Sequence, residues 1–136
     1  MGPEYPHIDT IWKRDEKRQI IPGDYSCPEF EYLSACDWTW TEKVDGTNVR
    51  VSPASPLIGN WDFGGRTAKA QMPTPLVNRL MEIFLSQRWE EEPGTGYDVT
   101  LYGEGYGAGI QKVGKLYNPD GPNFVLFDVR VGKWWL

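Results

Sequence analysis

The sequence predicts an α+β fold in which helices pack on a mostly antiparallel sheet. Fifteen glycines and 11 prolines divide the 136 residues into short segments, which favours strands and turns over long helices. Several of these segments alternate apolar and polar residues, as half-buried strands do, and one segment has the spacing of an amphipathic helix. Packing such a helix on an antiparallel sheet buries the apolar side of both.

The first half of the chain predicts a short helix and three strands. The helix is expected over residues 28–35. Residues 38–43 alternate aromatic and polar residues and predict a strand, which Asp45-Gly46 interrupts. Residues 47–51 resume the alternation, so the two strands are expected to pair as an antiparallel hairpin. A third strand is expected over 57–63.

The clearest helix is predicted to begin at Thr74, which can cap it, with Pro75 in its first position. Pro93-Gly94 is expected to stop it. Its apolar residues follow helical spacing: Leu76, Val77, Leu80, Met81, Phe84 and Leu85. Further strands are expected over residues 97–102, 123–129 and 131–136.

Composition excludes several classes of protein. The length suits one domain, and a net charge of −5 argues against a basic protein that coats nucleic acid. No apolar run approaches the ~20 residues that span a bilayer, and the N-terminus lacks the features of a signal peptide. Two cysteines and one histidine favour neither a disulfide framework nor a protein-ligated metal. A cytoplasmic location is expected.

A lysine at the end of a predicted strand is the first candidate for chemistry. In the segment TEKVDGTN, Lys43 is followed by Asp45 and Asn48. The segment by itself is typical of a hairpin whose Asp-Gly forms the turn, with an ordinary exposed lysine. The alternative is a nucleophilic lysine, which must lose its proton through burial or neighbouring cations.

An acidic residue among glycines is the second candidate. Glu104 lies in the segment LYGEGYGAGIQ, where four glycines occur within seven residues. A glycine-rich loop between strands is expected, and glycine allows a backbone to approach a ligand closely. The segment lacks the Gly-Lys-Ser/Thr of a phosphate-binding Walker loop. A carboxylate here is well placed to accept hydrogen bonds from the hydroxyls of a sugar.

Two further segments could bind a ligand. Asp128 lies in the apolar run NFVLFDV, where a carboxylate needs a partner, and Phe127 beside it could stack on a base. The run also predicts core positions at Val125, Leu126 and Val129. In the segment GGRTAK, Arg66 and Lys69 could present two cations to phosphates, or could lie in a solvated turn.

Taken in order, these segments resemble the covalent nucleotidyltransferases, and most closely the ATP-dependent RNA ligases of the phage and RNA-editing type. The resemblance rests on Glu-Lys-x-Asp-Gly-Thr-Asn, Arg-Thr-x-Lys, Tyr-Gly-Glu-x-x-Gly-x-Gly-Ile-Gln and Phe-Asp-Val, between residues 41 and 129. It implies an ATP-grasp-like ligase adenylation domain. It also implies a reaction in which the motif lysine takes AMP from ATP, assisted by Mg²⁺, and the AMP passes to the 5′-phosphate of an RNA end before a 3′-hydroxyl displaces it.

The resemblance also implies a role for each matching residue. Lys43 would be the nucleophile, and Glu42 would hold the adenine through its backbone. Phe127 would stack on the adenine and Glu104 would bind the ribose. The remaining matches would contact phosphates or support the site: Asn48, Arg66, Asp45, Lys69 and Asp128.

Two segments of the family pattern are missing from these 136 residues. They are the Glu-Gly-x-Val that binds metal and the Lys-x-Lys that holds the triphosphate. The chain is therefore expected to be the N-terminal part of an adenylation domain, over residues 1–136, with the remainder in a longer or second chain. The alternatives are a non-catalytic protein that binds nucleotides or RNA ends, and a DNA ligase or capping guanylyltransferase of the same superfamily.

Overall fold

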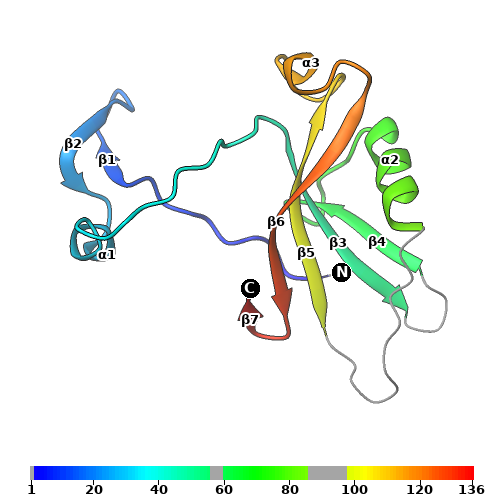
Figure 1. Cartoon of the computed structure of the whole chain (residues 1–136), viewed down its shortest axis with the longest axis horizontal. Coiled ribbons are helices and arrows are strands. Elements are labelled where there is room, and N and C mark those ends of the chain that lie inside the picture. Colours follow the sequence, from blue (N-terminus) through cyan, green and yellow to red (C-terminus); the bar gives the residue numbers. More distant parts are fainter. Residues whose placement is uncertain (1, 56–59, 86–97) are drawn as a thin grey trace. The chain divides into compact units, whose positions relative to one another are not determined.

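The computed structural model describes residues 2–55, 60–85 and 98–136. The chain divides into two compact units. Unit 1 comprises Met1–Tyr5 and Lys43–Leu136, and unit 2 comprises Pro6–Glu42. Unit 2 is thus inserted into the chain of unit 1, between Tyr5 and Lys43, as the connections in Figure 1 show.

Unit 2 is a two-stranded antiparallel sheet followed by a short helix. Strands β1 (Trp12–Arg14) and β2 (Ile20–Tyr25) pair so that Trp12 lies opposite Tyr25, with ring centroids 4.6 Å apart. Helix α1 (Pro28–Tyr32) has proline in its first turn, where the missing N–H costs nothing. The helix expected over 28–35 is present but ends at Tyr32, and residues 33–35 form turns.

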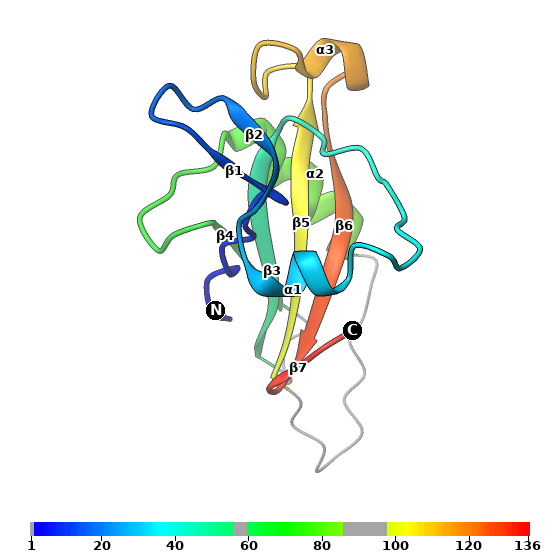
Figure 2. The same cartoon turned by 90° about the vertical axis from the view of Figure 1, so that its left-hand side faces the viewer.

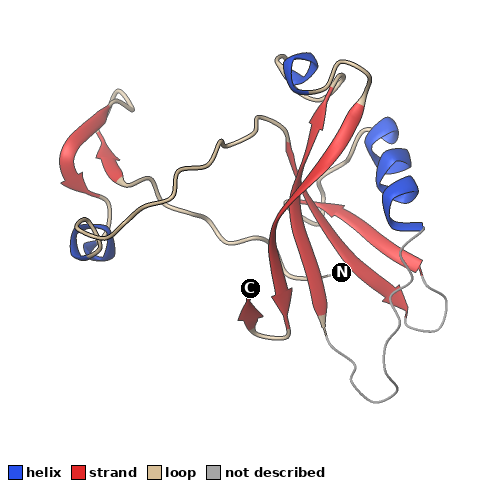
Figure 3. Cartoon of the chain, in the orientation of Figure 1, coloured by secondary structure: helices blue, strands red, loops and turns tan. Residues whose placement is uncertain are grey.

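Unit 1 contains a five-stranded sheet in the order β4-β3-β5-β6-β7, and every neighbouring pair is antiparallel. Figure 3 distinguishes its strands from the helices. The strands are β3 (Thr47–Ser55), β4 (Asn60–Gly65), β5 (Val99–Gly107), β6 (Pro122–Val131) and β7 (Trp134–Trp135). A four-residue helix, α3 (Gly114–Tyr117), lies between β5 and β6. The expected α+β fold with a mostly antiparallel sheet is confirmed.

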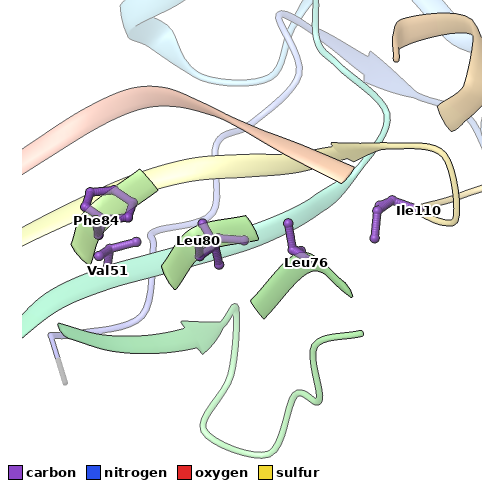
Figure 4. Close-up of a cluster of buried hydrophobic side chains, with 6 residues drawn as sticks. Val51, Leu76, Leu80, Phe84 and Ile110 are labelled. Atoms are coloured by element: carbon purple, nitrogen blue, oxygen red, sulfur yellow. The ribbon is translucent and has the colours of Figure 1, made fainter. Parts of the chain in front are cut away.

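Helix α2 (Thr74–Leu85) covers one face of this sheet, behind β5 in the view of Figure 2. Its buried residues Leu76, Leu80 and Phe84 recur every four positions and belong to one cluster, in which Figure 4 shows Phe84 beside Val51 of β3 and Leu76 on the side of Ile110. The predicted start of the helix is confirmed to within one residue: Thr74, expected as the cap, is the first residue of the helix, and Pro75 is the second. The expected stop at Pro93-Gly94 lies outside the described residues. The core of unit 1 therefore forms between α2 and the sheet.

The predicted hairpin between residues 38–43 and 47–51 is wrong. Residues 37–45 form no regular structure, and the neighbours of β3 are β4 and β5. Trp38 and Trp40 belong to unit 2, where they are 43% and 80% exposed, so they do not form the buried side of a strand. Alternation indicates that a segment can form a strand, but pairing depends on partners distant in sequence.

The glycine-rich segment forms a strand and not the expected loop over most of its length. Gly103 and Gly105 lie within β5, paired with Val49 and Thr47 of β3. A Cβ on Gly105 would lie 2.5 Å from a methyl group of Leu76, so glycine here lets α2 approach the sheet. Only the turn after Gly107 matches the prediction.

The strands near the end of the chain differ from the prediction in their bounds and burial. Val131 is the last residue of β6, so the final strand is shorter than expected. Val125 and Leu126 are 39% and 48% exposed, and their predicted core positions are wrong. Strand β7 pairs only with Arg130 and Val131, which leaves the middle of β6 at the edge of the sheet.

Among the described residues, no helix is long and apolar enough to cross a membrane.

Candidate functional site

The sheet of unit 1 has a second face, opposite α2, on which polar side chains collect. Side chains alternate between the faces of a strand, and residues directly opposite each other on paired strands share a face. Val49 and Val51 lie in the core beside α2, so Asn48, Arg50 and Ser52 lie on the other face, called the open face below. The residues opposite them on the neighbouring strands also lie on the open face. Glu104 lies opposite Asn48, Tyr102 opposite Arg50, and Asp128 opposite Tyr102.

A bulge in β6 brings two consecutive predicted residues onto the open face. Tyr102 pairs with Asp128 and Gly103 pairs with Leu126, so Phe127 is an extra residue without a partner in β5. Bulges of this kind re-aim side chains. Both side chains reach Tyr5: the phenol donates a hydrogen bond to Asp128 Oδ2, and the Tyr5 and Phe127 rings meet edge to face with centroids 5.1 Å apart.

Glu104 interacts with the predicted nucleophile. Burial raises the pKa of the Glu104 carboxyl above its ordinary value of 4.5. The positive charge of Lys43 and a hydrogen bond donated by the Gly46 N–H lower this pKa, and the negative charge of Asp45 raises it. Lys43 and Asp45 therefore lie close enough to Glu104 to influence its carboxyl, although Glu104 is distant from both in sequence. The Lys43 side chain is exposed.

The segment that carries Lys43 is held by residues of β5, of α3 and of the turn between them. The Asp45 N–H donates to Tyr117 Oη at 3.4 Å, and Gln111 Nε2 donates to Gly46 O at 2.9 Å. Gly46 also lies directly against the backbone of Gly105, where a Cβ would collide with the carbonyl oxygen. These contacts fix the approach of the lysine segment to β5.

Asn48 carries an acceptor without a partner. Its Oδ1 is buried and accepts no hydrogen bond from the described residues. A buried acceptor left unpaired costs about 1–3 kcal/mol, so a donor from a ligand or a water would be stabilised there. Because Asn48 lies opposite Glu104, such a donor would lie beside that carboxylate.

Two predicted residues of unit 1 are not joined to this group by any described contact. Arg66 and Lys69 are exposed in the segment after β4, and neither forms a hydrogen bond or ion pair within the part of the chain that the structure describes. This matches the solvated turn more closely than a preformed phosphate site. Glu42 is exposed and belongs to unit 2.

The described residues do not fit a protein-ligated metal centre. No group of three or more His, Cys, Asp or Glu side chains lies within coordinating range anywhere in residues 2–55, 60–85 and 98–136. Glu104 and Asp128 face the same side of the sheet, but no third ligand accompanies either. We assign no chemical step to Mg²⁺.

Two residues on the open face were not predicted from the sequence. Arg50 is 4% exposed and donates to Gly65 O at 2.8 Å and to Gly2 O at 2.7 Å. Its position between Val49 and Val51 was a usable signal, because alternation assigns it to the face of Asn48. Tyr5 had no such signal, because its partners lie at the opposite end of the sequence.

Scans of this chain against protein-family models, curated proteins and solved structures found no match.

Proposed function

We propose that the open face of unit 1 binds an adenine nucleotide, and that the chain is the lysine-bearing part of an ATP-dependent RNA ligase with Lys43 as its nucleophile. The observation that carries the proposal is the grouping of Lys43, Asp45, Asn48 and Glu104. Two separate motifs of the resemblance supply these residues: β3–β5 pairing puts Asn48 opposite Glu104, and Lys43 and Asp45 lie near enough to shift the pKa of Glu104.

The chemistry assigned to Lys43 is nucleophilic substitution at phosphorus. The exposed Lys43 ammonium gives its proton to water, its amine attacks the α-phosphorus of ATP, a P–N bond forms, and the P–O bond to pyrophosphate breaks. A second proton leaves the nitrogen for water, so that AMP remains on the lysine as a phosphoramidate. The exposed side chain gives the amine access to a nucleotide. Glu104 accepts hydrogen bonds from ribose hydroxyls, because its carboxylate is half-buried and fixed by the Gly46 N–H. Transfer of AMP to an RNA 5′-phosphate, followed by sealing, completes the proposed reaction.

A second candidate is nucleotide binding without catalysis. It is favoured by the absence, from these 136 residues, of the Lys-x-Lys segment that holds the triphosphate in the ligases that the chain resembles. The two candidates share the site and differ in whether a covalent bond forms.

Intact mass spectrometry separates the candidates. The protein is incubated with the magnesium salt of ATP and measured from neutral solution, because phosphoramidates hydrolyse in acid. A mass increase of one adenylate that maps to Lys43, is absent in Lys43→Arg and persists in Lys69→Arg supports the ligase. AMP binding without an adduct, unchanged by Lys43→Arg, supports the second candidate. If the protein also fails to bind AMP in an NMR titration, both are excluded.

A further inference from the structure

Residues 2–5, called the N-terminal strap below, lie on the open face of the sheet and are bonded to it along their length. The Gly2 N–H donates to Ser52 Oγ at 3.1 Å, Arg50 Nη1 donates to Gly2 O at 2.7 Å, and Tyr102 Oη donates to Pro3 O at 2.9 Å. The sheet residues in these bonds belong to β3 and β5. The strap therefore occupies the same face as the candidate nucleotide site.

The strap is a fixed part of the sheet's surface. Arg50 is 4% exposed and has no carboxylate partner among the described residues, so the Gly2 carbonyl is one of two groups that satisfy its guanidinium. Removing the strap would leave a buried charged donor unpaired, at a free-energy cost that nucleotide binding would have to offset. Gly2 also packs closely against Thr100, where a Cβ would not fit. A strap held in this way remains in place when a ligand binds and borders the site without blocking it.

The last residue of the strap, Tyr5, contacts Phe127 and Asp128, two residues of the candidate site. The Tyr5 ring contacts three aromatic rings: Phe127 at 5.1 Å, Tyr102 at 5.2 Å and Trp135 at 5.6 Å between centroids. Its hydroxyl donates to Asp128. Phe127 stays 43% exposed, so the edge-to-face contact with Tyr5 leaves ring surface free for stacking.

We infer that the strap forms one wall of a nucleobase site, in which Tyr5 borders a base stacked on Phe127 and holds Asp128 in orientation. This rests on the proposed function, because it needs the open face to bind a nucleotide. It adds to that function a residue that none of the matching motifs contains. It also predicts that the contribution of Tyr5 depends on the base and not on the phosphate or ribose.

The test compares a ligand that has the base with one that lacks it. AMP and ribose 5-phosphate are titrated by NMR into the wild-type protein, Tyr5→Ala and Tyr5→Leu. The leucine variant keeps most of the buried volume if the alanine variant does not fold. Tyr32→Ala is the matched control, because Tyr32 is 86% exposed in unit 2. We expect AMP binding to weaken about three- to tenfold in both Tyr5 variants, with ribose 5-phosphate binding unchanged.

Each other outcome overturns the inference, and the outcomes identify what failed. Tighter AMP binding in the Tyr5 variants would mean that Tyr5 blocks the nucleotide site. An equal loss for both ligands would mean that Tyr5 acts only on the stability of the face. Unchanged AMP binding would exclude Tyr5 from the site while leaving the proposed function standing. Absence of AMP binding by the wild-type protein would remove the inference and the proposed function together.

Discussion

Asn48 and Glu104 lie directly opposite each other on β3 and β5, with Asn48 Oδ1 buried and without a partner among the described residues. Cross-strand neighbours of this kind have Cβ atoms about 5 Å apart, so one ligand hydroxyl can contact both. Each residue comes from a different motif of the sequence. The pair therefore joins two segments that the sequence alone could only treat separately.

Glu104→Gln is expected to stabilise the protein near neutral pH. Burial raises the pKa of Glu104, so the folded state holds its proton more tightly than the unfolded state. The contribution of the protonated form is fully present below the ordinary pKa of 4.5 and is lost as the pH rises through the higher folded value. Urea unfolding should show the variant more stable than wild type at about pH 7 and equal to it at about pH 3. Equal stability at both pH values would contradict the burial argument.

Removing the charge of Lys43 is expected to raise the pKa of Glu104 further, because Lys43 is the nearby cation that lowers it. The measurement is a carbon-13 NMR titration of the Glu104 carboxyl in Lys43→Met. Lys69→Met is the control, since Lys69 does not contribute to the Glu104 pKa. An identical shift in both variants would show that the effect is one of net charge and not of proximity.

Tyr5→Phe is expected to destabilise the protein by about 1 kcal/mol at neutral pH through loss of the hydrogen bond to Asp128. Burial, followed by the bond and the charge of Asp128, raises the pKa of Tyr5 from 10.0 to about 12. The stabilisation from the protonated phenol is thus complete below pH 10.0 and is lost as the pH rises toward about 12.

The difference between wild type and Tyr5→Phe should therefore shrink in urea unfolding as the pH rises above 10.0. Tyr106→Phe is the matched control in the same unit, because its hydroxyl forms no hydrogen bond with any residue that the structure describes. A difference that does not change with pH would indicate lost packing in place of the lost bond.

Leu80→Ala is expected to cost about 2–5 kcal/mol of the free energy of unfolding, because Leu80 is fully buried between α2 and the sheet. The adjacent Met81→Ala should change it by less than about 0.5 kcal/mol, since Met81 is 45% exposed on the same helix. Urea unfolding of the two variants tests the position of the helix on the sheet. Equal losses would mean that α2 presents a different face.

The sequence predicted the elements whose signals are local and missed those that depend on distant partners. The start and buried side of α2 follow from Thr74, Pro75 and the spacing of Leu76 and Leu80, all within a few turns of one helix. The partner of β3 did not follow, because an alternating segment at 38–43 was nearer in sequence than β5. In the structure β3 pairs with β5, which is distant in sequence, and not with residues 38–43.

The same distinction applies to the site. Lys43, Asn48 and Glu104 were selected as residue types in motifs, and the structure adds their grouping. The bulge that brings both Phe127 and Asp128 to Tyr5 could not be predicted from the residues of β6, because a bulge changes strand pairing and not composition. Arg66 and Lys69, equally prominent in the sequence, lie exposed without described partners.

The contact between Tyr5 and Asp128 spans 123 positions of the chain, which has a consequence for the order of folding. During synthesis, Tyr5 emerges from the ribosome long before its carboxylate partner is made. Closing so long a loop carries a larger entropic cost than the nearer pairing of β3 with β4, and long-range pairings form slowly. The aromatic cluster around Tyr5 should thus be among the last parts of the protein to become native, after the packing of α2 on β3.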